Sequence, residues 1–409
     1  MVNGSGLLDG VVAAVLGESP TATLCGTYLA EHGATVYKFE QPGTGDPLRA
    51  LGPAVDGVSL RWAALAAGLR SVTCDLSDPR GRDLLGRAIP WIDVICDGRG
   101  DGRGDGRGDG RDDGRGDGDP DAEEFGDDVP VVLSFGTRDA FGGLQAGVAE
   151  GFLGEARGGL MEVTGDPARA PLALGTDVAV HLAAAYGAQA AVAGLLGARR
   201  TGRPFRMSVP VDGAVLRITE WAVPAVEIAD RVRRREGNFP SAVAPIGVYQ
   251  TADGDFVGVV GASDVNFRRL VAAMDRPELL DDVRYKSGQD RAANGPSLHE
   301  TIAAWAGSHT TADLLARCAE NVVIAAAVKS VRDLIADPQV TDRGDVRSLP
   351  DPVLGTIPQP APQPHIEARV PEPGARPAPL LGSANAELWV DRVGVSAAEL
   401  SALEAVGAV

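Results

Sequence analysis

Strand and helix signals alternate along the first hundred residues, and this alternation constrains the fold more than any other feature of the sequence. Apolar residues 7–17 are followed by a Ser-Pro helix start at residue 19 and a closing Gly33. Residues 34–40, 70–77 and 91–97 have strand composition, with a helix pattern over 78–89, and 128–136 predicts one more strand. Strands separated by helices of this length form βαβ units, so we predict an α/β fold with a mostly parallel sheet.

The second half of the chain has a different pattern. Residues 178–199 are Ala-rich and apolar on all sides, which predicts a buried helix. Two strand-like runs flank an Asp-Gly pair within 245–261 and indicate a β-hairpin. Helical segments follow, and the proline-dense stretch 350–379 predicts extended connections before two closing helices.

Residues 98–119 read GRGDGRGDGRGDGRDDGRGDGD, a four-residue repeat without a single apolar side chain. An RGD adhesion signal requires an exported protein, and calcium β-helix repeats have a nine-residue period with an apolar position. A phosphate cradle needs a defined glycine loop that leads into a helix. Glycine and charge alone bury no core, so we predict a flexible, solvated loop over 97–128.

The charge and the termini limit where such a chain acts and what it binds. The formal net charge of −18 argues against nucleic acid and anionic membranes as partners, since both bind cationic surfaces. The N-terminal residues lack the basic region and cleavage site of a signal peptide, so we expect a cytoplasmic protein. The four cysteines are scattered without metal-ligand spacing, and we predict no metal site.

Several stretches, in order, resemble CoA-transferase family III, the CaiB/BaiF family that includes the α-methylacyl-CoA racemases. They read ATLCGTYLAEHGATVYKFEQPGTGDPLR, LRSVTCDLSDPRGRDLL, GGLMEVTGDPARAPLALG, LLGARRTGRP, GVYQTADGDFVGV and APLLGSANAEL. The resemblance implies a Rossmann-like large domain from residues 1–218 and 331–409, a smaller α+β domain from 219–330, and an interlocked dimer. It also implies CoA transfer from an acyl-CoA to a carboxylic acid through an aspartate that forms a mixed anhydride. CoA enters as a substrate, and no cofactor is bound covalently.

The chain departs from the family at the nucleophile. The family aspartate lies five residues after the glycine at position 175 and 21 residues before the turn that begins at Thr201, and both counts end on Val180. A valine cannot form an anhydride. A shift of three residues would place Asp177 there instead, although Tyr186 and the ungapped run to Thr201 argue against that shift.

Two further residues are candidates for catalysis. The racemase branch has a histidine nine residues before the glycine turn at Gly159, and this chain has Glu150 there, which is a base if burial raises its pKa and otherwise a solvated glutamate. His181 is the histidine next to Val180, and a partly buried core histidine is the simpler interpretation.

Recognition of CoA also differs from the family pattern. Lys38 keeps its family position, but Leu69 replaces the lysine that usually precedes Arg70. Arg49, Arg70 and Arg99 are the residues that we expect to meet phosphates, because guanidinium groups suit bidentate contact. The repeat also stands where the family usually has a loop and helix bordering the nucleotide.

Two functions remain open from the sequence. In the first, the chain is a family III CoA-transferase whose catalytic group has moved to Asp177, Glu150 or His181. In the second, it is a non-catalytic acyl-CoA-binding protein or the partner subunit of an active paralogue. The first predicts a homodimer with acyl-CoA and carboxylic acid substrates, and the second allows a heteromer.

Overall fold

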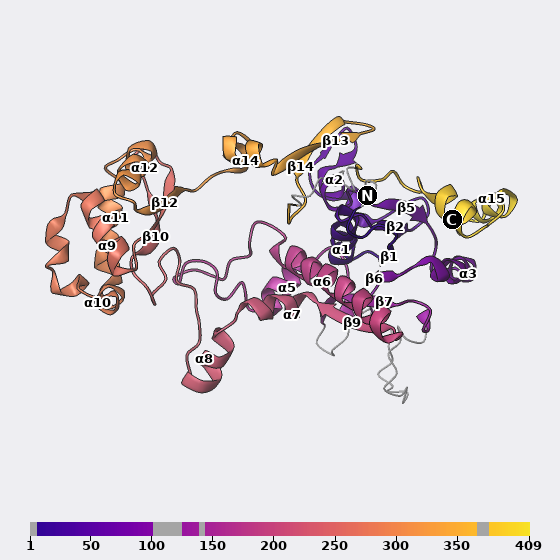
Figure 1. The fold of residues 1–409 in the computed structure, drawn as a ribbon, viewed down its shortest axis with the longest axis horizontal. Coiled ribbons are helices and arrows are strands. Elements are labelled where there is room, and N and C mark those ends of the chain that lie inside the picture. The colour runs from indigo at the N-terminus through magenta and orange to yellow at the C-terminus, as the bar shows by residue number, and fades with distance from the viewer. Residues whose placement is uncertain (1–5, 101–124, 139–143, 366–375) are drawn as a thin grey trace. The chain divides into compact units, whose positions relative to one another are not determined.

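The computed structural model describes residues 6–100, 125–138, 144–365 and 376–409 (Figure 1). The chain forms two compact units: Met1–Leu160, Leu174–Val223 and Gly344–Val409 make the larger one, and Met161–Ala173 with Pro224–Arg343 make the smaller one. Residues 161–173 and 331–343, which the sequence analysis assigned to the large domain, pack with the smaller unit. For the first segment, an ion pair of 2.8 Å between Arg235 and Glu162 is one contact that holds it there. Most of the predicted loop at 97–128 lies outside the described residues.

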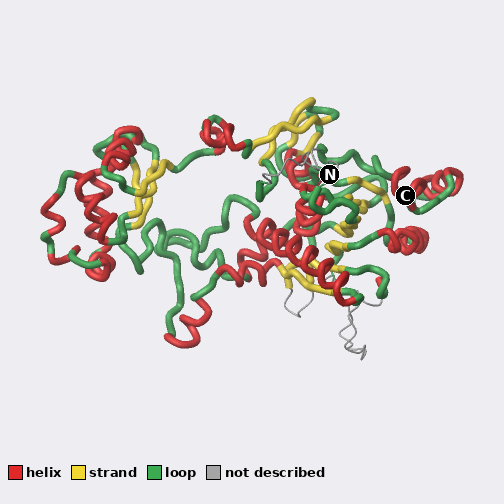
Figure 2. Tube along the Cα trace, in the orientation of Figure 1, coloured by secondary structure: helices red, strands yellow, loops and turns green. Residues whose placement is uncertain are grey.

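The larger unit is built on a sheet with six parallel strands in the order β5-β2-β1-β6-β7-β9, and the short β8 pairs antiparallel with the end of β7. Strands are yellow and helices red in Figure 2. In chain order this is 3-2-1-4-5-6, the arrangement of doubly wound nucleotide-binding folds. The predicted parallel α/β architecture is thus confirmed. The strands are β1 Val12–Gly17, β2 Thr35–Glu40, β5 Arg70–Thr73, β6 Val94–Gly98, β7 Val131–Arg138, β8 Leu144–Gln145 and β9 Phe205–Pro210.

Helices cover both faces of this sheet, which explains why its central strands are apolar throughout rather than alternating. Alternate residues of β1 belong to two different cores. One core packs against α1 (Pro20–Glu31), α2 (Leu60–Leu65), α6 (Val178–Thr201) and α7 (Val211–Ile218). The other packs against α3 (Pro79–Ala88) and two elements from the end of the chain, the π-helix η5 (Ala386–Arg392) and α15 (Ala397–Ala405).

The buried helix predicted at residues 178–199 is confirmed as α6, and one of its faces is exposed. Its buried residues recur at helical spacing from Ala179 to Leu195 and face the sheet and α1, whereas Val192 and Leu196 on the opposite side are exposed. The helix is long and apolar enough to cross a membrane by composition, but its packing against the sheet makes it a core helix of the larger unit.

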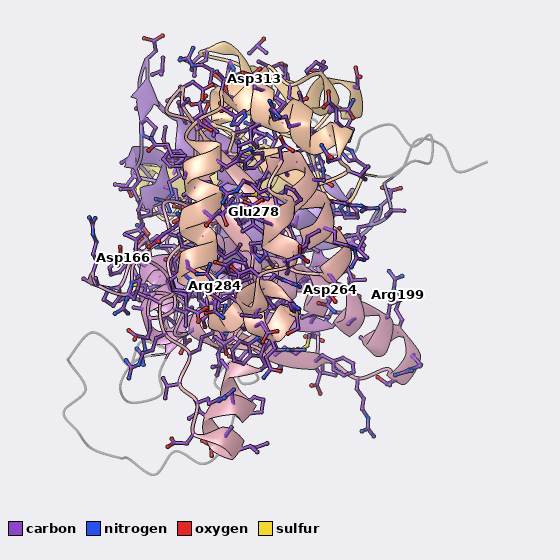
Figure 3. The ribbon with its side chains drawn as sticks, turned by 90° about the vertical axis from the view of Figure 1, so that its left-hand side faces the viewer. Asp166, Arg199, Asp264, Glu278, Arg284 and Asp313 are labelled. Atoms are coloured by element: carbon purple, nitrogen blue, oxygen red, sulfur yellow. The ribbon has the colours of Figure 1, made fainter. Side chains whose placement is uncertain are left out.

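The smaller unit contains the predicted β-hairpin, formed by β10 (Ile246–Gln250) and β11 (Phe256–Val260) and extended by β12 (Ile324–Ala327) into an antiparallel sheet. Helices α9 (Asp264–Met274), α11 (Gly295–Ala306) and α12 (Thr311–Glu320) bury a separate core with it. Exposed charged residues stand on this unit's helical segments, including the labelled Asp264, Glu278, Arg284 and Asp313 (Figure 3).

The remaining elements are short. They are η1 Pro47–Ala50, β3 Ala54–Val55, β4 Val58–Ser59, η2 Ile89–Trp91, α5 Glu150–Arg157, α8 Ala222–Ala229, η3 Pro277–Leu280, η4 Val283–Tyr285, α10 Gly288–Ala293, α13 Val331–Ile335, α14 Pro338–Arg343, β13 Val346–Asp351 and β14 Gly355–Pro360.

Candidate active site

The first turn of α1 is in contact with the buried side chain of Glu150. Ser19 caps the helix, and the Glu150 carboxylate, at the start of α5, reaches the same helix end. Its Oε1 accepts hydrogen bonds from Ser19 Oγ at 2.8 Å, Thr21 N at 2.7 Å and Thr21 Oγ1 at 2.5 Å. A helix N-terminus favours negative charge, so Glu150 takes the position at which doubly wound proteins bind phosphate.

Glu150 is 2% exposed, and its second oxygen, Oε2, has no hydrogen-bond partner. Burial raises the pKa of this carboxyl group, although the hydrogen bonds from Thr21 and Ser19 oppose the shift. The sequence analysis expected a raised pKa only if Glu150 were buried, and that condition is met. The first oxygen is fully engaged by α1, which makes Glu150 an organiser of the helix end.

The edge of the sheet beside α1 is closed by direct backbone contact. A Cβ atom on Gly98, at the end of β6, would lie 2.4 Å from the Ser19 Cβ and 2.9 Å from the Ala22 Cβ. A Cβ on Gly17, at the end of β1, would lie 2.5 Å from the backbone of Gly98. Glycine at these two positions therefore lets the carboxyl ends of β1 and β6 approach each other and α1 closely, at the point where the strand order reverses.

Asp177 and Val180 meet at the start of α6, beside the first turn of α5. A Cβ atom on Gly151 would lie 2.8 Å from Val180 Cγ2 and 3.7 Å from Asp177 Oδ1. Val180 is 1% exposed and belongs to the core between α6 and the sheet. Asp177 occupies the N-cap position but makes no capping hydrogen bond, and Oδ2 instead accepts from Arg61 Nη2 at 2.6 Å.

His181 lies one residue beyond Val180 and pairs with Tyr28 of α1. Tyr28 Oη and His181 Nδ1 are 2.8 Å apart and share a hydrogen bond. The histidine remains accessible to solvent, yet the side chains around it desolvate it and lower its pKa, an effect that Asp177 opposes. Burial raises the pKa of Tyr28 to about 12, so its phenol is neutral at physiological pH.

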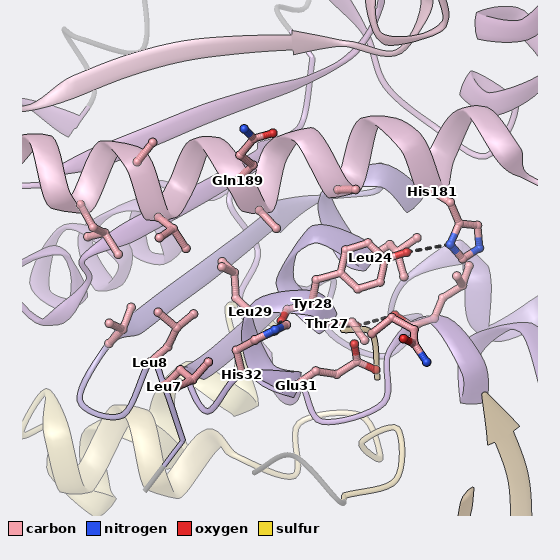
Figure 4. A pocket seen from close by; sticks show the side chains of 18 of the residues that line it. Leu7, Leu8, Leu24, Thr27, Tyr28, Leu29, Glu31, His32, His181 and Gln189 are labelled. Atoms are coloured by element: carbon pink, nitrogen blue, oxygen red, sulfur yellow. Dashed lines mark hydrogen bonds between the residues drawn. The ribbon is translucent and has the colours of Figure 1, made fainter. Parts of the chain in front are cut away.

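This pair stands at one end of an apolar groove of about 1170 Å³ between α1, α6 and residues 359–363 (Figure 4). Leu24, Leu29 and Ala185 are typical of its lining, and Gln189 lies along α6 farther from His181. An apolar groove with few polar groups at one end is the usual form of a small-molecule site.

The four residues expected to contact CoA are all held by carboxylates of this chain. Arg49 makes a bidentate contact with Glu40 at 2.7 and 2.8 Å and lies over the Trp62 ring. Arg70 pairs with Glu387, and Arg99 pairs with Asp97 at 2.5 Å. Lys38 is fully buried and pairs with Asp46 at 2.8 Å while donating to the carbonyl of Gly17.

A profile of CoA-transferase family III matches residues 8–113 and 132–385. The chain belongs to this family. Relatives in CoA-transferase family III include the succinyl-CoA–D-citramalate CoA-transferase of Chloroflexus aurantiacus, which is 32% identical over 97% of both chains. The succinyl-CoA–L-malate CoA-transferase beta subunit of the same organism is 30% identical over 82% of this chain and 81% of the relative. The crystal structure of a CAIB/BAIF family protein from Brucella suis shares the fold, with a TM-score of 0.78 and 23% identity over 95% of this chain and 99% of that chain.

Sequence reasoning did not assign Arg61, Tyr28 or Thr21 to the site, and it placed Ser19 only as a helix start. Each contacts its site partner across more than a hundred residues of chain, so no local spacing points to the contact. The residues that it did find are only partly together: Asp177, Val180 and His181 share the start of α6, with Glu150 next to Gly151. Within the described ranges, no group of three or more His, Cys, Asp or Glu side chains is placed to hold a metal ion.

The raised pKa of Glu150 predicts how stability changes with pH. The folded protein binds this proton more tightly than the unfolded chain, whose glutamates titrate near about 4.3. The contribution of Glu150 protonation to the free energy of unfolding is therefore fully present below the unfolded pKa. It is lost as the pH rises through the folded pKa. We expect Glu150→Gln to remove this decline, so that its stability relative to wild type improves from acidic to neutral pH.

Urea unfolding over a series of pH values measures this difference. Glu404→Gln, on the exposed side of α15, is the control and should follow the wild-type pH dependence. An advantage of Glu150→Gln that shrinks as the pH rises would contradict the assignment.

Proposed function

We propose that this chain transfers CoA from an acyl-CoA to a carboxylic acid, with Asp177 as the covalent nucleophile and dicarboxylic acids as the substrate class. The observation that carries the proposal is the position of the Asp177 carboxylate, which lies beside Gly151 and Val180 and is partly exposed. It stands within one helical turn of the residue that the family motif assigns to the nucleophile. The dicarboxylates come from the relatives, whose names pair succinyl-CoA with citramalate or malate.

In one reaction cycle the Asp177 carboxylate forms an anhydride twice, first with the donor acyl group and then with the acceptor. An oxygen of Asp177 attacks the thioester carbonyl, the C–S bond breaks, and CoA leaves as the thiolate from an acyl-aspartyl anhydride. The thiolate then attacks the aspartyl carbonyl, which releases the donor acid and leaves CoA as a thioester on Asp177. The acceptor carboxylate attacks that thioester and forms a second anhydride. Attack of the thiolate on the acceptor carbonyl releases the new acyl-CoA and restores the Asp177 carboxylate.

The surroundings of Asp177 suit this chemistry. The Arg61 guanidinium fixes the position of the Asp177 carboxylate before substrate binds, through an ion pair with a short contact. The His181 imidazole is neutral at physiological pH and adds no positive charge that would compete for the nucleophile. The apolar groove, which His181 lines, offers the acyl chain of a substrate a water-poor surface near the nucleophile.

The second candidate is a non-catalytic subunit or acyl-CoA-binding protein of the same fold. Val180 favours it, since an aliphatic residue at the family nucleophile position is fully enclosed and leaves no room for an attacking group. One relative is itself named as the beta subunit of a CoA-transferase. On this alternative, an active paralogue completes a heteromer, whereas the first candidate works as the homodimer that the family resemblance implies.

Covalent trapping tests the proposal directly. The purified chain is incubated with succinyl-CoA and a panel of carboxylic acids, and hydroxylamine is added during turnover. Hydroxylamine converts an aspartyl anhydride or thioester into a hydroxamate, so we expect the peptide that contains Asp177 to carry that mass change. An adduct on another residue would move the nucleophile elsewhere. No exchange and no adduct with any acid would leave the non-catalytic candidate.

A further inference from the structure

Arg61 holds Asp177 with only part of its hydrogen-bonding capacity. It lies in the first turn of α2, and its side chain is 28% exposed. The contact with Asp177 is made by Nη2 alone, at 2.6 Å, while the Nε atom is buried and has no hydrogen-bond partner. By contrast, Arg49 uses both Nε and Nη2 on a single carboxylate, Glu40.

This arrangement leaves a preferred interaction unmade. A guanidinium presents Nε and Nη2 as a planar fork that matches the two oxygens of one carboxylate. A buried donor without a partner is unfavourable, because it has lost its hydrogen bonds to water. A second carboxylate that approached the Nε edge would recover this cost and would compete with Asp177 for Nη2.

We propose that Arg61 is the recognition site for a carboxylate of the substrate: the Arg61 side chain turns its Nε–Nη2 edge toward the substrate, and the bound carboxylate displaces Asp177. This inference rests on the proposed function, because the displaced Asp177 is the nucleophile there. A dicarboxylate has two ends. One carboxylate binds Arg61, and the other end is the reacting carboxyl group or thioester. A monocarboxylate has no second end, so Asp177 stays paired with Arg61 and attacks poorly.

The charges near Arg61 fit this exchange. Asp177 makes no capping bond to α6, so its release does not cost the helix a cap. The Asp177 side chain is 40% exposed, and the carboxylate that leaves Arg61 can therefore be solvated until it attacks. The neutral His181 does not offer the leaving carboxylate a competing cation.

Calorimetric titration of the whole chain with succinate, without acyl-CoA, tests the site independently of turnover. We expect Arg61→Gln to weaken succinate binding by at least about tenfold and Arg61→Lys to retain part of it, because a lysine keeps the charge but loses the fork. Asp177→Asn should tighten succinate binding, since it removes the internal competitor. Butyrate, which lacks the second carboxylate, should bind the wild type more weakly than succinate does.

The matched control is Arg80→Gln, which breaks an exposed pair with Asp78 of the same 2.6 Å length and should leave succinate binding unchanged. If the Arg61–Asp177 pair only tethers α2 to α6, Arg61→Gln and Asp177→Asn would both lower the melting temperature. The two variants would then not show opposite changes in succinate affinity. That result, or the absence of succinate binding to the wild type, overturns the proposal. If succinate binding depends on Arg61 but hydroxylamine traps no adduct, the recognition site at Arg61 is supported and the role of Asp177 as nucleophile is refuted.

Discussion

CoA exchange by the Asp177→Asn variant is expected to fall by at least about 10³-fold, the scale on which enzymes lose activity when a covalent nucleophile is removed. Asparagine has almost the same shape, and its amide oxygen still accepts the hydrogen bond that Arg61 donates to the carboxylate in the wild type. An amide is a far weaker nucleophile and does not form an anhydride. The rate of succinyl-CoA consumption with a dicarboxylate acceptor, followed by chromatography, measures the loss.

Val180→Asp is the companion variant. It restores a carboxylate where the family motif has one, but it also buries a charge in the core of α6 and lowers stability. If Asp177 is the nucleophile, Val180→Asp gains no activity over the wild type. If the wild type is inactive and Val180→Asp transfers CoA, the chain is a transferase fold that has lost its nucleophile, and the first candidate function is wrong.

The largest expected effect on stability comes from Lys38→Met. Lys38 is fully buried and pairs with Asp46, whose carboxylate also caps the 3₁₀ helix η1. Methionine fills most of the lysine volume but leaves the Asp46 charge enclosed without a cation. Removing one partner of a buried pair typically costs about 3–5 kcal/mol, and we expect a loss of that size in the free energy of urea unfolding.

The double variant Lys38→Met, Asp46→Asn separates charge from packing. Asparagine keeps the cap on η1 and removes the isolated charge, so the double variant should regain a large part of the lost stability. A double variant as unstable as Lys38→Met would show that the lysine acts through packing and its bond to the Gly17 carbonyl.

Local signals predicted most of the fold. The Ser19 cap, the β-branched strands and the Asp-Gly turn of the hairpin act within a few residues, and the structure confirms each of them. The buried helix expected at residues 178–199 is the core helix α6, but its alanines and leucines leave no periodic pattern that separates its face on the sheet from its face on the groove.

The candidate site was predictable only in part. The family spacing located Val180 and its neighbours Asp177 and His181, which lie on one helix turn. Their hydrogen-bond partners, Arg61 and Tyr28, lie on α2 and α1, and only the fold brings them to the start of α6. Nothing near Arg61 in the sequence distinguishes it from a surface arginine.

The order in which the sheet's two faces are covered has a consequence for how the chain folds as it is made. All strands of the large sheet, and the helices α1 and α6, are complete by residue 210. The opposite face, which includes Tyr37 and Phe39, receives Leu388 and Trp389 only from the last part of the chain. During synthesis α3 already covers part of that face, but the part that packs against η5 and α15 stays exposed while residues 224–343 of the smaller unit emerge from the ribosome. A nascent chain in this state exposes apolar surface and is most prone to aggregation, or most dependent on chaperones, until its final residues arrive.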